Sequence, residues 1–253
     1  MDKRLVDVAF IPARNGSIRL PGKNIKVLNG VPLIAYSIHS AINSGQFSEV
    51  IVSTDSTEIA QIAMDWGARV PALRPPEYSG SDSTDLEWLM HAVEHLISFP
   101  KEQIDCIAIL RPTNPLRTKS TIKEAMKKFK KNPWADSLRA MEITQIHPGK
   151  MWRVNSAMEA TPYIDQSNEL IPTHNRPTQS LERLWVQNAS LEITRLSSLL
   201  ASKSISGKKV LAYEMPEFEG LDINTHLDWK LLEALIRENP EIIPNLTQPE
   251  RRN

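Results

Sequence analysis

The sequence predicts an α/β fold in which a doubly wound, mostly parallel sheet carries helices on both faces. Short apolar, β-branched runs alternate with amphipathic segments of helical period through the first half of the chain. Glycine, proline and polar residues separate these segments, as they do at the ends of strands and helices. The chain has 253 residues, of which 41% are hydrophobic, so it can bury a core without disulfides. Because right-handed crossovers join parallel strands, the alternation predicts a helical layer on each face.

The predicted elements follow one another in order along the chain. Buried strands are expected at residues 6–11, 50–53 and 104–110, where the sequence is almost entirely apolar. Amphipathic helices are expected at residues 32–44, 57–66, 86–97 and 120–129, and Gly45 and Gly67 follow the first two. A further strand is expected at residues 210–215, and a last helix at residues 229–236.

The pattern changes between residues 144 and 183, which are rich in proline, asparagine, glutamine, threonine and histidine. This stretch is too long for a plain loop in a compact domain. It is either disordered, or an arm that orders against another subunit or closes over a ligand. Disordered segments are generally poor in aromatic residues, so Trp152, Tyr163 and the following Trp185 favour the arm.

Composition and charge exclude several classes of partner. Thirty basic and thirty acidic residues balance to a net charge of zero, so no global field recruits nucleic acid or an anionic membrane. The N-terminal residues lack the apolar core of a signal peptide, and no apolar run reaches the length of a membrane span. Cys106 is the single cysteine and has apolar neighbours, which indicates a buried thiol in a reducing compartment. These features predict a soluble, cytoplasmic protein with no nucleic-acid or membrane partner.

A basic loop, IPARNGSIRLPGKN at residues 11–24, follows the first predicted strand. Ligands of open α/β sheets bind at the carboxyl ends of strands, so Arg14, Arg19 and Lys23 would lie beside a binding crevice. The spacing of its two glycines rules out the GxxxxGK[ST] phosphate loop, and the dinucleotide fingerprint GxGxxG is absent. The loop is therefore interpreted either as a site for a polyphosphate or as a structural turn with solvated charges.

Four motifs, in order, carry a resemblance to a known family: the basic loop, VIVSTDSTEIAQIAMDWGARV, LRPTNPLR and GLDINTHLDW. Together they closely resemble the nucleotidyltransferases that activate acidic sugars, in particular the CMP-N-acetylneuraminate (acylneuraminate) cytidylyltransferase family. The resemblance implies one Rossmann-like domain over residues 1–253, with residues 144–200 as a dimerisation or acceptor-lid arm of a homodimer. It also implies transfer of CMP from CTP to the anomeric hydroxyl of a nonulosonic acid, an acidic nine-carbon sugar. Pyrophosphate would be released, and Mg²⁺ would be required.

The resemblance assigns the nucleotide side of the site to residues of the first half of the chain. Arg14 and Lys23 would contact the phosphates as catalytic cations, with Arg19 as a helper, because charge builds on the leaving pyrophosphate. Asn24 both donates and accepts hydrogen bonds, which suits a cytosine edge or the ribose. The base pocket would be completed by Arg74 and Ser83. The alternative for Arg74 is a solvated loop cation, and the alternative for Ser83 is a helix N-cap.

The metal would be held near the C-terminus, where the family has two carboxylates in a DxD motif. This chain reads Asp222-Ile223-Asn224, so one ligand is a carboxylate and the other a neutral amide. The alternative is that this segment only makes a turn and caps the last helix. Asp55 is a second candidate carboxylate, although it can also cap the helix that begins near Thr57.

The acceptor side is assigned by resemblance to Arg111, Lys150, Arg176 and Gln179. Arg111 stands where sialic acid members commonly have glutamine in LQPTSPLR, and its extra charge suggests a different acid, of legionaminic or pseudaminic type. Lys150 matches a family lysine near the acceptor, whereas the other two match the family element only loosely. The segment QNAS at residues 187–190 stands where NGA is common, so the lost glycine leaves its backbone conformation open.

Two other functions stay open at this point. A cytidylyltransferase for 3-deoxy-octulosonate shares the RLPGK sequence but lacks an equivalent of LRPTNPLR. A relative that binds nucleotide without turnover is conceivable because of Asn224 and Arg111.

Overall fold

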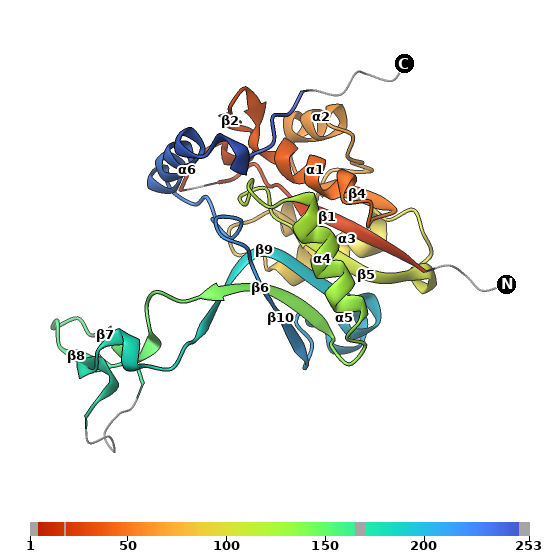
Figure 1. Ribbon diagram of the computed structural model, residues 1–253. Helices are drawn as coiled ribbons and strands as arrows, with labels where there is room; N and C mark the ends of the chain where they lie inside the picture. Colours follow the sequence, from red (N-terminus) through yellow and green to blue (C-terminus); the bar gives the residue numbers. More distant parts are fainter. Residues whose placement is uncertain (1–4, 18, 165–170, 248–253) are drawn as a thin grey trace. The chain divides into compact units, whose positions relative to one another are not determined.

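The computed structural model describes residues 5–17, 19–164 and 171–247, and Figure 1 shows the course of the chain. The chain forms two compact units. The first comprises Met1–Ala140 together with Asn188–Asn253, and the second comprises Met141–Gln187.

A six-stranded sheet in the order β10-β6-β9-β5-β1-β4 forms the centre of the first unit. Strand β1 runs parallel to both β4 and β5, whereas β9 pairs with β5 in the antiparallel sense. The strands span β1 (Val6–Pro12), β4 (Glu49–Ser53), β5 (Ile104–Leu110), β6 (Ser137–Ile143), β9 (Trp185–Arg195) and β10 (Val210–Glu214). The three strands predicted in the first half of the chain are therefore confirmed, as is the mostly parallel sheet.

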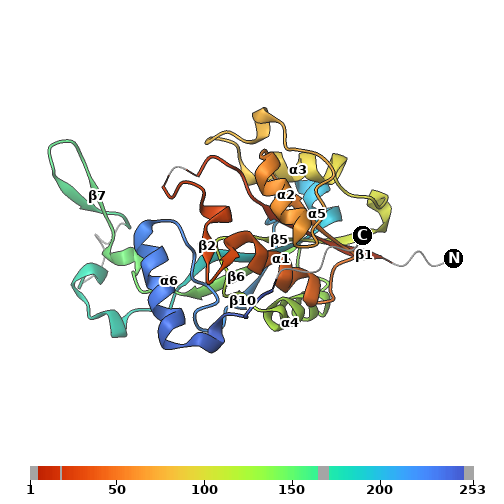
Figure 2. The same cartoon turned by 90° about the horizontal axis from the view of Figure 1, so that it is seen from above.

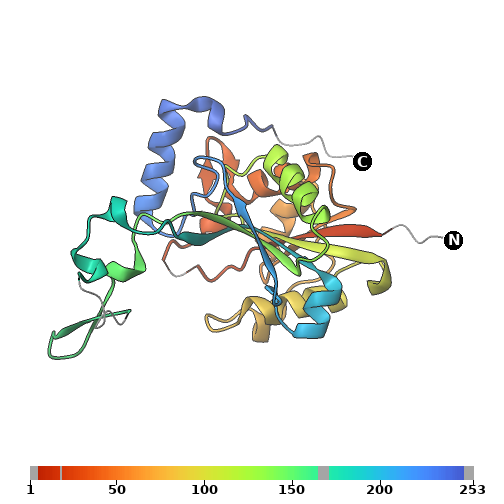
Figure 3. The ribbon, with the colours of Figure 1, turned by 60° about the horizontal axis from the view of Figure 1, so that its bottom comes forward.

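Helices cover both faces of this sheet. Alternate side chains of the inner strands point to opposite sides, so each face carries apolar residues against which helices pack. Ala9 and Ile11 of β1 join one hydrophobic cluster, whereas Val8 and Phe10 join the other. The first cluster includes side chains of α1, α2, α4 and α6, and the second includes side chains of α3 and α5 (Figure 3). The helices span α1 (Leu33–Asn43), α2 (Thr57–Asp65), α3 (Asp85–His95), α4 (Lys119–Lys130), α5 (Leu196–Ser202) and α6 (His226–Glu238). Figure 2 shows them from above.

Several helices begin at side-chain caps, and two caps differ from the sequence expectation. Ser56, rather than Asp55, caps α2 by accepting from the Ile59 N–H. Thr84, rather than Ser83, caps α3 in a reciprocal box with Glu87. Hydroxyl side chains fit this position because they satisfy an unpaired N–H of the first helical turn. Asp55 and Ser83 are therefore not the helix N-caps that the sequence allowed them to be.

The last helix also begins at a side-chain cap. Thr225 caps α6 and Asp228 completes the box. The carboxylate of Asp228 also accepts the Asn224 N–H at 2.9 Å, so the segment just before the helix is fixed to its first turn.

The second unit contains the hairpin of β7 (Trp152–Val154) and β8 (Ala160–Pro162). Its aromatic side chains make local contacts: Trp152 lies 4.7 Å from the His174 ring, and Arg153 lies over Tyr163. The unit ends at residue 187, earlier than the predicted arm, because β9 and α5 place residues 188–200 in the first unit. Residues 165–170 of that arm lie outside the described part of the chain.

Two further sequence expectations concern Cys106 and membrane-spanning helices. The Cys106 thiol is buried in β5, and burial raises its pKa to about 12, so the thiol stays protonated at neutral pH. Among the described residues, no helix combines the length and apolar composition needed to cross a bilayer.

Candidate active site

A cavity of about 610 Å³ opens at the carboxyl ends of β1 and β5, within the volume range of small-molecule sites. The loop that follows β1 forms one wall, and Arg111, Pro112 and Thr113, which follow β5, form another. The basic side chains lining it are Arg14, Arg19, Lys23, Arg74 and Arg111, and the carboxylates lining it are Asp85 and Asp222. A cavity with an excess of cations on a chain of zero net charge is a local site for an anion.

Lys23 of the basic loop is not a solvated charge, because it is buried at 9% exposure, whereas Arg19 of the same loop is exposed. Its Nζ donates to the Ile223 carbonyl at 2.6 Å, in a segment 200 residues further along the chain. Burial lowers the pKa of Lys23, and the charge of Asp222 opposes this shift. Asn24 is also buried and donates to the Arg14 carbonyl, while Arg14 itself donates to the Gly80 carbonyl at 2.6 Å. Both ends of the loop are thus held against other parts of the cavity wall.

Arg74 is not a solvated loop cation either, since its side chain is 5% exposed. Its guanidinium donates to the Ser53 hydroxyl and carbonyl at the end of β4 and lies over the Trp88 ring. Burial lowers the pKa of Arg74 to about 10, so the group stays charged at neutral pH. Ser83 also lines the cavity, and its hydroxyl donates to the Glu77 carbonyl.

The predicted metal residues form a hydrogen-bonded chain with the loop cations. Asn224 Oδ1 accepts from Arg19 at 2.8 Å and from Lys23 at 3.3 Å, and Asn224 Nδ2 donates to Asp222 Oδ2 at 2.5 Å. The reverse amide orientation would set an NH₂ group against two cations and an oxygen against a carboxylate. The contacts therefore fix the orientation in which the single side-chain oxygen of Asn224 faces cations.

Asp222 and Asn224 consequently differ in how they fit a metal ion. Asp222 Oδ1 is buried and has no hydrogen-bond partner among the described residues, so it retains a free oxygen ligand. Mg²⁺ takes one or two protein carboxylates together with phosphate oxygens and water, which a single aspartate satisfies. Asn224 instead holds the other oxygen of Asp222 and faces Arg19 and Lys23. Asp55 accepts the Asn15 N–H and does not line the cavity.

A separate acidic cluster at the opposite end of the sheet carries its own cation. Asp7, Asp105 and Cys106 place potential ligand atoms close together near the starts of β1 and β5. Lys130 Nζ lies 2.7 Å from Asp7 and 2.5 Å from Asp105, so an ammonium group already neutralises these carboxylates. The cluster is therefore not a candidate for the catalytic metal.

The motif LRPTNPLR makes hydrogen bonds that hold residues 220–223 in place. The Thr113 carbonyl accepts the Ile223 N–H at 2.9 Å, and Asn114 Nδ2 donates to the carbonyls of Gly220 and Leu221. Arg117 is almost fully buried and donates to the carbonyls of Arg111 and Ser190 and to the Ser37 hydroxyl. A buried guanidinium group is stabilised only while its N–H groups keep their acceptors. The Arg117 side chain therefore fixes the position of the loop that follows β5.

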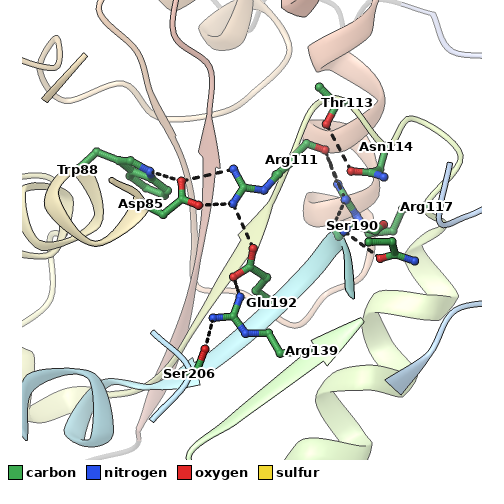
Figure 4. A network of polar contacts seen from close by, with 11 residues as sticks. Asp85, Trp88, Arg111, Thr113, Asn114, Arg117, Arg139, Ser190, Glu192 and Ser206 are labelled. Atoms are coloured by element: carbon green, nitrogen blue, oxygen red, sulfur yellow. Dashed lines mark hydrogen bonds and ion pairs between the residues drawn. The ribbon is translucent and has the colours of Figure 1, made fainter. Parts of the chain in front are cut away.

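Arg111 lines the cavity, but its charge is matched by neighbouring carboxylates (Figure 4). Its guanidinium pairs with Asp85 at 2.6 Å and with Glu192 at 3.1 Å. The extra positive charge expected from the sequence is therefore neutralised within the protein. Whether Arg111 contacts the acceptor stays a prediction.

Ala189 occupies the position at which the family commonly has glycine, and its backbone is strained. Its φ is 57°, in the left-handed region, and its side chain lines the cavity. Alanine in this conformation brings Cβ close to the following carbonyl oxygen, which glycine avoids. The backbone thus keeps a glycine-like conformation at the cavity wall without the glycine.

The remaining predicted acceptor residues belong to the second unit. Lys150 ends a short 3₁₀ turn, and Gln179 lies in another. Arg176 donates to the Ile171 carbonyl at 2.9 Å. Their roles at the acceptor stay predictions.

Among the cavity residues that sequence reasoning did not assign to the site are Tyr78, Asp85 and Trp88. Asp85 is the first residue of α3 and pairs with Arg111, 26 positions away. Nothing in the sequence links the two, because the contact depends on where α3 lies relative to β5. The Trp88 Nε1–H donates to the same carboxylate at 2.9 Å, and a helical spacing of three residues from Asp85 was the available signal.

Comparison with known proteins finds sequence relatives that cover most of the chain. Residues 8–192 match the sequence profile described as cytidylyltransferase. A CMP-N,N'-diacetyllegionaminic acid synthase from Legionella pneumophila is 33% identical over 93% of this chain and 98% of its own length. A pseudaminic acid cytidylyltransferase from Campylobacter jejuni is 41% identical, over 50% of this chain and 54% of its own length.

Solved structures agree with the fold. A CMP:2-keto-3-deoxy-manno-octonic acid synthetase complexed with CTP superposes with a TM-score of 0.64, over 92% of this chain and 99% of its own. The identity is 16%, so this likeness supports the fold alone. A cytidylyltransferase from Leptospira borgpetersenii superposes with a TM-score of 0.58 at 19% identity, over 98% of this chain and 100% of its own.

Proposed function

The chain belongs to the cytidylyltransferase family, and from that premise we propose that it transfers CMP from CTP to a nonulosonic acid. The observation that carries the proposal is the cavity at the carboxyl ends of β1 and β5, where a buried lysine and several arginines gather. A nucleoside triphosphate supplies the negative charge that this excess of cations would bind. The full-length likeness to a legionaminic acid synthase supports an acidic nine-carbon sugar as the acceptor.

In the proposed reaction, the anomeric hydroxyl oxygen of the sugar attacks the α-phosphorus of CTP. The new oxygen–phosphorus bond forms as the bond between the α-phosphorus and the oxygen bridging to the β-phosphate breaks, the hydroxyl proton passes to water, and pyrophosphate leaves. Lys23, Arg14 and Arg19 lie where they could neutralise charge on the phosphates and the leaving group. Asn24, Arg74 and Ser83 line the same cavity and are proposed to bind the nucleoside. The role of the protein would be to align two anionic reactants in one low-dielectric site.

We further propose that Mg²⁺ binds with Asp222 as its single charged protein ligand. The supporting observation is the buried, unpartnered Oδ1 of Asp222 in the described structure. The metal would neutralise phosphate charge, while Asn224 would hold Asp222 and the loop cations in place. Removal of divalent ions with EDTA should stop turnover, and added Mg²⁺ should restore it.

A homodimer in the cytoplasm completes the proposal. Large apolar side chains of the second unit are exposed, among them Met158 at 80% and Trp152 at 45%, which favours their burial against another copy. Light scattering that shows a monomer at micromolar concentration would refute the dimer. The buried free thiol of Cys106 supports a reducing compartment, which cell fractionation would test.

The function itself is tested by incubating the protein with CTP, Mg²⁺ and a panel of acids. The panel contains N-acetylneuraminate, legionaminic and pseudaminic acids, and 3-deoxy-octulosonate, and products are identified by mass. We expect a CMP-nonulosonate and an equal amount of pyrophosphate. A product from 3-deoxy-octulosonate alone would replace the proposed acceptor, and CTP binding without any product would identify a non-catalytic relative.

A further inference from the structure

Four charged side chains form one network that reaches the cavity wall at Arg111 and Asp85 (Figure 4). Arg111 Nη2 donates to Asp85 Oδ2 at 2.6 Å, and Arg111 Nη1 lies 3.4 Å from the other oxygen of the same carboxylate. Arg111 Nη2 also contacts Glu192 at 3.1 Å, and Glu192 forms an ion pair with Arg139. Two guanidinium groups and two carboxylates therefore balance one another.

The two ends of this network differ in burial. The side chains of Glu192 and Arg139 are 3% and 8% exposed, so this pair is an internal support. The side chains of Asp85 and Arg111 are 44% and 23% exposed, and both line the cavity. A ligand in the cavity would meet the second pair and not the first.

Asp85 is held firmly on Arg111, so the pair would meet a ligand intact. Burial by itself would raise the pKa of Asp85, but the charge and hydrogen bond of Arg111 lower it on balance. The carboxylate also accepts from Trp88 Nε1 and lies at the start of α3, where a negative charge is favoured. A ligand carboxylate on Arg111 would be a third anion on one guanidinium, or would have to displace Asp85.

We propose that the Arg111–Asp85 pair recognises a neutral polar substituent of the acceptor, a hydroxyl or acylamino group, and that the acceptor's carboxylate binds elsewhere. This inference rests on the proposed function. The pair presents N–H donors from Arg111 and carboxylate lone pairs from Asp85 while carrying no net charge. A glutamine amide likewise combines a donor and an acceptor without charge.

The proposal is tested by removing the pair in two steps and measuring the acceptor KM. Arg111→Gln leaves Asp85 unpaired beside two anionic substrates, so the acceptor KM should rise about tenfold or more. Adding Asp85→Asn restores neutrality, and the double variant should return to within about threefold of wild type, since Glu192 keeps its pair with Arg139. If the charge of Arg111 binds the acceptor's carboxylate, the double variant stays as impaired as Arg111→Gln, which would overturn the proposal.

Asp85→Asn alone provides an independent check if Arg111→Gln does not fold. If Arg111 bound the acceptor's carboxylate, removal of the Asp85 charge would strengthen that contact and lower the acceptor KM. A fall in acceptor KM therefore contradicts the proposal, whereas an unchanged or raised KM agrees with it. Unchanged acceptor KM in all three variants would assign the pair a purely structural role and also overturns it. Thermal melting and CTP affinity of each variant separate loss of fold from loss of acceptor binding. A wild-type protein that makes no CMP-sugar rejects the proposed function, whereas an unrescued double variant beside an active wild type rejects this inference alone.

Discussion

Replacing Lys23 with alanine should remove most turnover while the protein stays folded. The ammonium group is desolvated at the cavity wall, where it lies 2.6 Å from the Ile223 carbonyl and 3.3 Å from Asn224 Oδ1. A cation about 4 Å from a phosphate oxygen contributes roughly 4 kcal/mol at an effective dielectric constant of about 20. Part of this is offset by the burial that lowers the pKa of Lys23. We therefore expect kcat/KM for CTP to fall about 10²–10³-fold, as for the loss of one strong electrostatic contact in an active site.

The effect on stability should be small because two terms oppose each other. Alanine leaves the Ile223 carbonyl without its charged donor, which costs about 1–3 kcal/mol for a buried group. The same change removes a buried ammonium group, which the lowered pKa of Lys23 shows to be unfavourably solvated. We expect the melting temperature to change by less than about 6 °C.

Pyrophosphate release at varied CTP concentration measures the activity, and calorimetry measures the fold and CTP affinity. Lys26→Ala is the matched control, because Lys26 lies three positions on, stacks over the Trp229 ring and does not line the cavity. It should retain activity within about twofold while losing only a cation–π contact of about 0.5–1 kcal/mol. A folded Lys23→Ala protein with kcat/KM within about fivefold of wild type would refute the reasoning, as would an equal loss in Lys26→Ala. Lys23→Met retains the apolar stem and replaces alanine if that variant unfolds.

Three more outcomes follow from the geometry of the cavity. Ala189→Gly should raise stability by about 0.5–1 kcal/mol, because relief of the left-handed alanine, about 1–2 kcal/mol, outweighs the greater unfolded-chain entropy of glycine, about 0.4–1 kcal/mol. Ala72→Gly, at an exposed loop position without positive φ, should lower stability, and equal signs in denaturant melts would contradict this. Asn224→Asp should reduce the half-saturating Mg²⁺ concentration and Asp222→Ala should increase it, and unchanged metal dependence in both would remove this segment from the metal site. The pKa of Asp85 is lowered in the fold, so its stabilisation is complete above the pKa of an unfolded aspartate, about 3.9, and is lost as pH falls through the folded value. The stability difference between wild type and Asp85→Asn should therefore shrink in melts below about pH 4, and a constant difference would argue against the pairing.

Local sequence patterns predicted β1, β4, β5 and β10 and every α-helix in the described part of the chain except α5, but they did not predict β6 or β9. Residues 104–110 are apolar throughout, and the structure has β5 over the same residues. Alternation in β1 explains why neighbouring residues such as Ala9 and Phe10 join different cores. The basic loop was recognisable because its charges directly follow a buried strand. These features depend on neighbours within a few positions, which local periodicity and turn chemistry reveal.

Contacts between residues far apart in the chain depend on the tertiary fold. The contact of Lys23 with Ile223 joins residues 200 positions apart, and it turns an apparent surface cation into a buried one. The pairing of Arg111 with Asp85 cancels a charge that the sequence presented as free, because it depends on the packing of α3 beside the end of β5. The strand order, with β9 antiparallel beside β5, brings Glu192 to the same guanidinium. Charges that attract at about 3 Å and are screened beyond about 10 Å cannot be paired from spacing along the chain, since the fold alone sets those distances.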